Sequence, residues 1–218
     1  MNKSTVHILQ ELSDNNTEEW VQEHILAIRS AKHDFKLLVQ QLIEKLQEFD
    51  HHLLGLEAED CIFPQKRNLA ISRFKAPYKT HFGAYIAMGG RKSEYAGYYI
   101  QVQPGNSFLA GGMYAPAGPV LKKLHQELEY TADELRTIIN NEAFMAKFGG
   151  LEQRSIQGAP KGFPKDHKDI DLLSLSGFFA VHELSDKSLV QADFAEYALS
   201  VLKSLYPLNK FLNETFIN

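Results

Sequence analysis

The chain has 218 residues and a formal net charge of -4 at pH 7. Hydrophobic residues make up 44% and charged residues 23%, which excludes disorder and fibrous architectures and predicts one globular domain over residues 1–218. A pI of about 6.1 excludes a protein whose whole surface coats nucleic acid, so any basic site must be local.

Cysteine usage and the absence of long apolar runs point to the cytosol. Cys61 is the only cysteine, which excludes an intramolecular disulfide and a cysteine-rich zinc site. Residues 1–8 lack the apolar core of an export signal, and no stretch approaches the roughly 18 apolar residues of a membrane span. We therefore expect a cytoplasmic protein with no membrane partner, in which Cys61 is a small packed hydrophobe.

The first quarter of the chain, residues 4–55, has a helical pattern. Asn16 followed by Glu19 predicts a capping box and hence a helix start. Beyond it, apolar residues recur every three or four positions, which predicts one long or two consecutive helices with Trp20 in the core.

The middle of the chain reads as antiparallel strands. Three short segments, residues 82–88, 95–103 and 107–114, are rich in aromatic and branched side chains and are separated by Gly and Pro turns. Alternation along the second of them places Tyr99, Gln101 and Gln103 on one face of the strand. The sheet is therefore expected to have a polar face.

Helical periodicity returns after Pro119. A loop over residues 155–171 is followed by a predicted strand at 175–182 and a helix at 189–205 that Pro207 would end. The fold class is α+β, with a central, mostly antiparallel sheet flanked by N-terminal, middle and C-terminal helices.

Familiar catalytic and cofactor motifs are missing. The glycines of residues 105–113 are not followed by Lys-Ser/Thr, no G-x-G-x-x-G opens a helix, and there is no G-x-S-x-G elbow. We interpret Gly111-Gly112 as a bulge or a close backbone approach within a strand, one that could also line a pocket. We therefore expect no cofactor, and the sequence does not decide whether the protein is an enzyme.

An acidic loop over residues 166–171 carries the best metal-like set. His167, Asp169 and Asp171 would face one way if the chain were extended. Lys165 and Lys168 lie beside them and would neutralise the carboxylates, and an Asp at the end of a loop often caps the next element. We favour the interpretation without metal.

Two basic and aromatic segments, residues 71–81 and 159–171, are the best functional lead. Arg73, Lys75 and Lys79 would share a face of an extended chain, and clustered Arg and Lys side chains hold phosphate or carboxylate. Tyr78 or Phe163 could stack on a ring of a ligand. The alternative is a solvated edge strand or a set of ion pairs to the acidic loop.

The motifs also resemble a known family. They are Asn15-Asn16 followed by Trp20, Pro77-Tyr78-Lys79-Thr80-His81, Gly97-Tyr98-Tyr99-Ile100-Gln101, Gly111-Gly112-Met113-Tyr114 and Pro160-Lys161-Gly162-Phe163-Pro164-Lys165-Asp166-His167. In this order, over residues 8 to 213, they are similar to a largely bacterial family of conserved hypothetical proteins, domain of unknown function two-four-six-one. The resemblance implies one domain and a stand-alone protein, and it does not indicate which activity, if any, the protein has.

This chain departs from that family at one motif. Family members often carry Arg-Asp-x-Arg-Phe-x-x-Asp-Lys before the Pro-Tyr-Lys, and Asn68, Ala70 and Phe74 replace three of its charged residues here. Any function that needs those charges would be lost or altered. The resemblance therefore transfers a limited set of site candidates, namely Arg67, Lys75, Tyr78, Lys79, Lys161, Lys165, Asp166 and His167.

The leading hypothesis is a small anionic ligand, bearing phosphate or carboxylate, held by both basic segments. If chemistry follows, His167 is the candidate acid or base, oriented by Asp166 or Asp169. The second hypothesis is a non-enzymatic module that binds nucleic acid or an acidic protein, and overall acidity disfavours it. The third is a scaffold without a ligand. The predicted ligand-binding residues are Arg67, Arg73, Lys75, Tyr78, Lys79, Lys161, Phe163, Lys165, Asp166 and His167.

Overall fold

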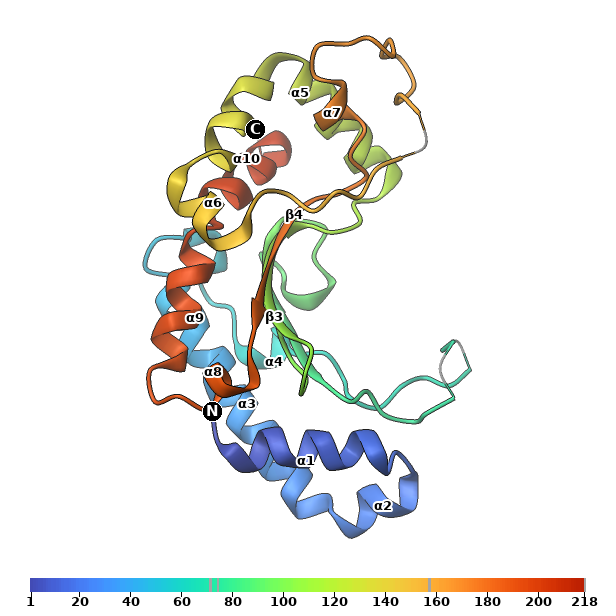
Figure 1. The fold of residues 1–218 in the computed structure, drawn as a ribbon, viewed down its shortest axis with the longest axis vertical. Helices are drawn as coiled ribbons and strands as arrows, with labels where there is room; N and C mark the ends of the chain where they lie inside the picture. The colour runs from blue at the N-terminus through green and yellow to red at the C-terminus, as the bar shows by residue number, and fades with distance from the viewer. Residues whose placement is uncertain (71, 74, 157, 218) are drawn as a thin grey trace. The chain divides into compact units, whose positions relative to one another are not determined.

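The structure is a computed structural model that describes residues 1–70, 72–73, 75–156 and 158–217 (Figure 1). Ile71 and Phe74, which belong to the first basic segment, lie outside the described residues. Gln157, in the loop predicted at 155–171, also lies outside them.

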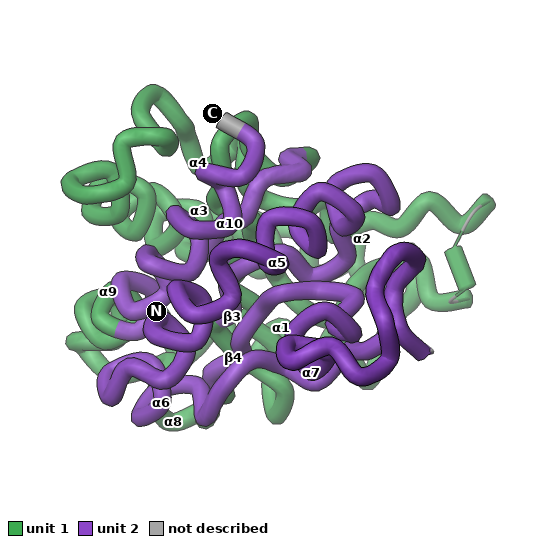
Figure 2. The backbone as a smooth tube through the Cα atoms, turned by 90° about the horizontal axis from the view of Figure 1, so that it is seen from above, with its two compact units in different colours: residues 1–92, 99–109, 183–200 green, residues 93–98, 110–182, 201–218 purple. Residues whose placement is uncertain are grey.

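Two compact units make up the chain, and Figure 2 colours them separately. Unit 1 contains residues 1–92, 99–109 and 183–200, and unit 2 contains residues 93–98, 110–182 and 201–218. Each unit is described by itself below. The single domain expected from the sequence stays a prediction.

A four-stranded antiparallel sheet has the order β1-β2-β3-β4. The strands are β1 (Phe82–Ile86), β2 (Gly97–Val102), β3 (Ser107–Met113) and β4 (Phe178–Leu184). Helices from the N-terminal, middle and C-terminal parts of the chain flank it, which confirms the predicted α+β class. The last strand begins at Phe178 rather than at Leu175, because Leu175 instead forms an isolated bridge with Ser155.

Helices α1 (Lys3–Asp14), α2 (Glu18–Glu23) and α3 (Ile25–Leu46) open unit 1. Asp34 of α3 accepts hydrogen bonds from Asn2 and Thr5, which ties α1 along α3 as Figure 1 shows. Shorter elements follow in this unit: η1 (His51–Leu53), α4 (Ala58–Cys61), η2 (Gly90–Lys92) and α8 (Asp186–Leu189).

The predicted start of α2 is wrong by one residue. Thr17, not Asn16, is the N-cap, and its hydroxyl accepts the backbone N–H of Trp20 at 3.2 Å. Trp20 is only half-buried, and its ring stacks on His24 with centroids 4.1 Å apart. The Asn16 side chain instead forms hydrogen bonds with the backbone of Tyr78.

Unit 2 is built on α5 (Gly118–Ile139), α6 (Glu142–Phe148), α7 (Ile170–Leu173) and α10 (Tyr206–Ile217). Pro119 lies in the first turn of α5, where a missing N–H costs nothing. The helix predicted at 189–205 is shorter, α9 (Phe194–Lys203). Pro207 lies in the first turn of α10 rather than ending the helix before it, which is a position that proline tolerates.

Buried apolar side chains and one close backbone approach define the cores. Tyr98, Ile100 and Val102 of β2 are fully buried, as the alternation predicts for the face opposite Tyr99. Gly112 of β3 has a φ of +107°, and a Cβ there would lie 2.1 Å from the carbonyl oxygen of Phe178. The predicted close approach at Gly111-Gly112 is therefore confirmed. Among the described residues, no helix is long and apolar enough to cross a membrane.

Candidate functional site

A short antiparallel ladder in unit 1 carries the first basic segment. Lys66 pairs with Tyr78, Arg67 donates its N–H to the carbonyl of Pro77 at 2.8 Å, and Lys79 donates to Gln65 at 2.8 Å. Further along, Phe63 donates to the carbonyl of Gly83 at 2.9 Å. Residues 65–67 therefore pair antiparallel with residues 77–79, and residues 62–63 pair with Gly83 and Ala84 of β1. Between the two paired parts, residues 80–82 lie opposite Pro64 alone, so the register changes there.

Alternation along this ladder places two basic side chains on one face, with a third nearby. Residues two apart, and residues opposite one another, share a face of an antiparallel pair, so Arg67 and Lys79 lie on the same face. The Lys79 Nζ lies 5.3 Å from the centroid of the Phe63 ring, as expected if Phe63 shares that face. His81 lies at a bend just after Lys79, close enough for the charges of Lys79 and Arg67 to act on its imidazole. We call Arg67, Lys79 and His81 the cationic face.

The proximity of these three groups, together with their burial, affects their protonation. Burial, then the charges of Lys79 and Arg67, lower the pKa of His81 to about 4. Burial and the charge of Arg67 also lower the pKa of Lys79. No carboxylate in the described part of the chain forms a salt bridge with Lys79 or His81. The cationic face is therefore partly desolvated and positive.

Three aromatic rings, those of Phe63, Tyr99 and Phe108, lie next to the cationic face. A Cβ at Gly83 would lie 2.7 Å from the Tyr99 hydroxyl, so the glycine makes room for Tyr99 over β1. The Tyr99 ring lies 6.3 Å from Phe63 and 5.6 Å from Phe108. Burial raises the pKa of the Tyr99 hydroxyl, which keeps the phenol neutral.

Hydrogen bonds fix the orientation of the polar face predicted for β2. The Gln101 Nε2 donates to the backbone carbonyl of Asn106 at 3.2 Å and to the Gln103 Oε1 at 3.0 Å. Because this assigns the Gln101 amide, its Oε1 must accept from the Tyr99 hydroxyl, 3.1 Å away. The Tyr99 oxygen therefore keeps its lone pairs for another donor.

Asn16 holds the Pro-Tyr-Lys segment in place. Its Nδ2 donates to the Tyr78 carbonyl at 3.0 Å, and its Oδ1 accepts the Tyr78 N–H at 3.1 Å. The Arg67 guanidinium also donates to the carbonyls of Ala76 and Tyr78. Tyr78 is buried, and the Lys66 ammonium lies 6.0 Å from its ring. The sequence indicates Asn16 as a helix cap but does not predict its pairing with Tyr78, which is 62 residues away along the chain.

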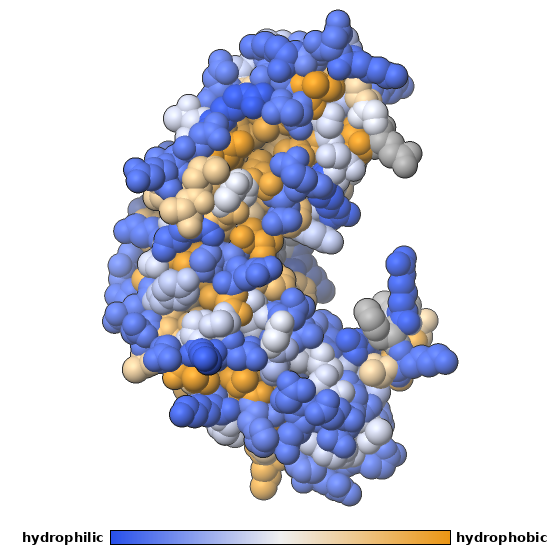
Figure 3. Space-filling view, viewed as in Figure 1, coloured by the Kyte–Doolittle hydropathy of each residue, from blue (hydrophilic) through white to orange (hydrophobic). Residues whose placement is uncertain are grey.

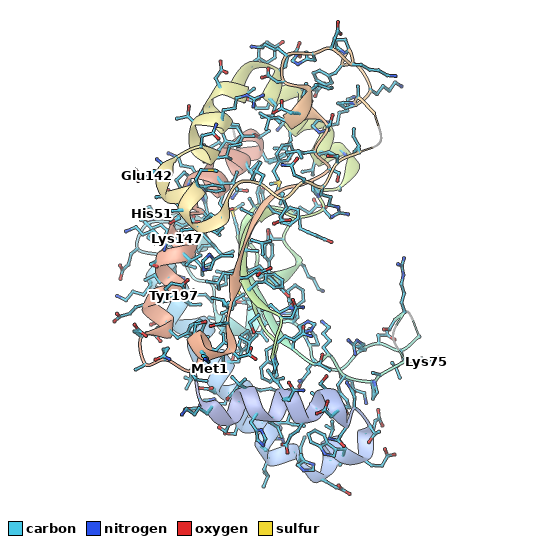
Figure 4. The ribbon with its side chains drawn as sticks, in the orientation of Figure 1. Met1, His51, Lys75, Glu142, Lys147 and Tyr197 are labelled. Carbon is cyan, nitrogen blue, oxygen red and sulfur yellow. The ribbon has the colours of Figure 1, made fainter. Side chains whose placement is uncertain are left out.

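Arg73 and Lys75 lie apart from the ladder. Both are exposed, and the backbone bends at Arg73 and over residues 75–77. The extended chain that would align Arg73, Lys75 and Lys79 is therefore not formed. Figure 4 shows Lys75 on the outer part of this segment, and Figure 3 shows a mostly hydrophilic surface there.

The second basic segment lies in unit 2. Lys161, Lys165 and Asp166 are exposed, and the Phe163 ring stands perpendicular to His167 with centroids 5.8 Å apart. The His167 Nδ1 accepts the backbone N–H of Asp169 at 3.1 Å.

This bond corrects the expected partner of His167. We expected the carboxylate of Asp166 or Asp169 to orient the ring, whereas a backbone N–H does so. An accepting Nδ1 leaves the ring proton on Nε2 in the neutral form.

Arg136 of α5, which the sequence did not single out, binds the acidic loop. It contacts Asp171 at 2.7 and 3.0 Å and the Asp169 Oδ1 at 3.2 Å. Arg136 lowers the pKa of Asp171. We expected Lys165 and Lys168 to neutralise these carboxylates, but of the two only Lys168 is near, 3.7 Å from Asp169. Across the described ranges, no three His, Cys, Asp or Glu side chains gather to hold a metal ion.

Cys61 is packed away from every surface. It is 0% exposed, and burial raises the pKa of its thiol to about 12. Because the thiolate is the nucleophile, this cysteine is a packing residue, as the sequence indicates.

Comparison with protein families supplies one match. The model of a family described as conserved hypothetical protein, DUF2461, matches residues 4–211. The chain belongs to this family. No curated protein and no solved structure matches the chain. The family resemblance expected from the motifs is therefore confirmed, and the family supplies no activity.

Proposed function

We propose that the protein binds a small anionic ligand, bearing phosphate or carboxylate, at the cationic face of unit 1. The observation that carries the proposal is geometric: Arg67 and Lys79 share one face of the ladder with His81 close to them, and no carboxylate in the described part of the chain forms a salt bridge with Lys79 or His81. Burial first, and then the neighbouring cations, lower the pKa of Lys79 and of His81. Positive charges that lie close together repel one another and raise the free energy of the empty site. A bound anion lowers this free energy because it attracts each of them.

The groups around the face suit such a ligand in three ways. The ammonium of Lys79 supplies a charge-assisted hydrogen bond, and Phe63 and Tyr99 offer ring surfaces beside it. The Tyr99 oxygen accepts a bond from a hydroxyl or amide of the ligand. A bound anion also favours the protonated form of His81, so binding takes up a proton below neutral pH.

Arg73 and Lys75 favour the second candidate, a module that binds nucleic acid or an acidic protein. Both are exposed on a segment without regular structure, as are Lys161 and Lys165 in unit 2. Such a contact depends on many surface charges and weakens steeply with salt, whereas a partly buried anion site is screened less. A scaffold without a ligand is the third candidate.

A thermal-shift screen separates these candidates. The ligands are inorganic phosphate, phosphorylated sugars, citrate and a short oligonucleotide, each at low and at high salt. A ligand that binds only the folded state raises Tm. Lys79→Met removes a charge from the cationic face, and Lys75→Met is the matched control on the exposed segment.

We expect a phosphate- or carboxylate-dependent rise in Tm that persists in salt, that Lys79→Met abolishes and that Lys75→Met leaves intact. A rise only with the oligonucleotide, lost in salt and reduced by Lys75→Met, would favour the interaction module. No rise with any ligand would favour the scaffold. Lys165→Met tests the second basic segment in the same screen.

A further inference from the structure

A pocket in unit 1 lies next to the cationic face, and Phe63 belongs to both. It has a volume of about 330 Å³ and lies between α3, α4 and η2. Phe35 of α3 and Phe82 of β1 form its aromatic part, with ring centroids 5.4 Å apart. This volume is at the lower end of the range of small-molecule sites.

Polar contacts hold the walls of the pocket in place. The Gln40 Oε1 accepts the backbone N–H of Ala58 at 3.0 Å, which fixes α4 to α3. The Arg91 Nη1 donates to the backbone carbonyls of Glu59 and Asp60, at 2.8 and 3.1 Å, which fixes η2 to α4. The pocket is therefore preformed by contacts that need no ligand.

Positive charge dominates the lining. Lys32, Lys36 and Arg91 contribute three positive charges, and Glu59 is the one carboxylate among the described residues that line the pocket. Lys36 forms an ion pair with Glu59. Lys32 forms no ion pair in the described part of the chain, and burial and the charge of Arg29 lower the pKa of its ammonium.

The two lysines are placed to act together. Lys32 and Lys36 are four residues apart on α3, so their side chains are neighbours on one face of the helix. One carboxylate between them would pair with Lys32 and compete with Glu59 for Lys36. The apolar part of the pocket would then receive the apolar body of the same molecule.

We infer that this pocket binds an amphipathic carboxylate, with its carboxylate on Lys32 and Lys36. Its flat apolar body would lie against the half-buried Ile62 and Phe63, which cover the buried rings of Phe35 and Phe82. An apolar body distinguishes this ligand from phosphate and small sugar phosphates, and the variants below distinguish the two sites for a carboxylate. The two sites share Phe63, which lines this pocket and also lies beneath Lys79.

Calorimetric titration with a matched pair of probes tests the inference. 2-Naphthoate carries the carboxylate, and 2-naphthamide has nearly the same shape without the charge. We expect naphthoate to bind at least about tenfold more tightly than naphthamide, the size of one charge-assisted hydrogen bond. Equal affinities, or no heat from naphthoate up to about 5 mM, would overturn the inference.

Two variants locate the probe and move its affinity in opposite directions. Lys32→Met removes the unpaired ammonium and is expected to weaken naphthoate binding about tenfold. Glu59→Gln removes the competing carboxylate and is expected to strengthen it severalfold. A misfolded variant cannot produce the second result. Binding unchanged by both substitutions would refute the site.

Lys79→Met distinguishes this inference from the proposed function. It is expected to leave naphthoate affinity within about twofold of wild type, because Lys79 does not line the pocket. Lys32→Met is expected to leave the phosphate-dependent rise in Tm unchanged. Loss of naphthoate binding in Lys79→Met together with no effect of Lys32→Met would reassign the probe to the cationic face.

Discussion

The pH dependence of stability reports directly on His81. Its pKa is lowered from 6.5 to about 4 in the folded chain, by burial first and then by Lys79 and Arg67. The folded state therefore disfavours the imidazolium. The contribution of neutral His81 to the free energy of unfolding is complete above pH 6.5. It is lost as pH falls from 6.5 towards 4, because the unfolded chain binds the proton first.

The interval between the two pKa values sets the size of the effect. It corresponds to at most about 3 kcal/mol. His81 is only partly buried, so solvent screening reduces the expected loss to about 1–2 kcal/mol. His125 has a pKa lowered by burial and contributes with the same sign, so the comparison must be made against a variant that keeps His125.

Urea unfolding of wild type and His81→Gln at pH 7.5 and pH 4.5 supplies that comparison. Wild type is expected to lose about 1–2 kcal/mol more than His81→Gln between the two pH values. His33→Gln removes an exposed histidine and serves as the control, with the pH dependence of wild type expected. Equal losses in wild type and His81→Gln would refute the electrostatic account of the cationic face.

Three further predictions concern two side chains that hold loops in place, Asn16 and Arg136, and the buried thiol of Cys61. Asn16→Ala removes both bonds to the Tyr78 backbone and is expected to cost about 1–3 kcal/mol in urea unfolding, whereas Asn15→Ala, at an exposed position, should cost a few tenths. Arg136→Met deprives the acidic loop of its guanidinium and is expected to speed limited proteolysis over residues 155–171; an unchanged rate would contradict that role. Cys61 is expected to resist thiol reagents at pH 8 until urea unfolds the chain, and labelling of the native protein would show that its thiol is not buried.

Local patterns predicted much of the fold. The alternation in β2 gave both the fully buried face and the polar face of Tyr99, Gln101 and Gln103, because a strand has a period of two whatever surrounds it. The helix cap was displaced by one residue, since Asn16 and Thr17 both have side chains that can cap.

Contacts between residues far apart in the chain could not be predicted from the sequence. Asn16 and Tyr78 are 62 residues apart, and Arg136 lies 35 residues from Asp171, so no local period connects them. His81 lies at the end of the first basic segment and is not among the predicted ligand-binding residues. The backbone bends at Thr80 and His81, so the pattern of an extended chain does not place its imidazole beside Lys79 and Arg67.

The most direct test of anion binding at the cationic face is an NMR titration of the His81 imidazole with and without inorganic phosphate. Without phosphate, the ring is expected to titrate with a pKa of about 4. With phosphate bound, the pKa is expected to rise by at least about one unit, because the anion stabilises the imidazolium, and Lys79→Met should remove most of that rise. An identical His81 titration in the presence and absence of phosphate would contradict the account.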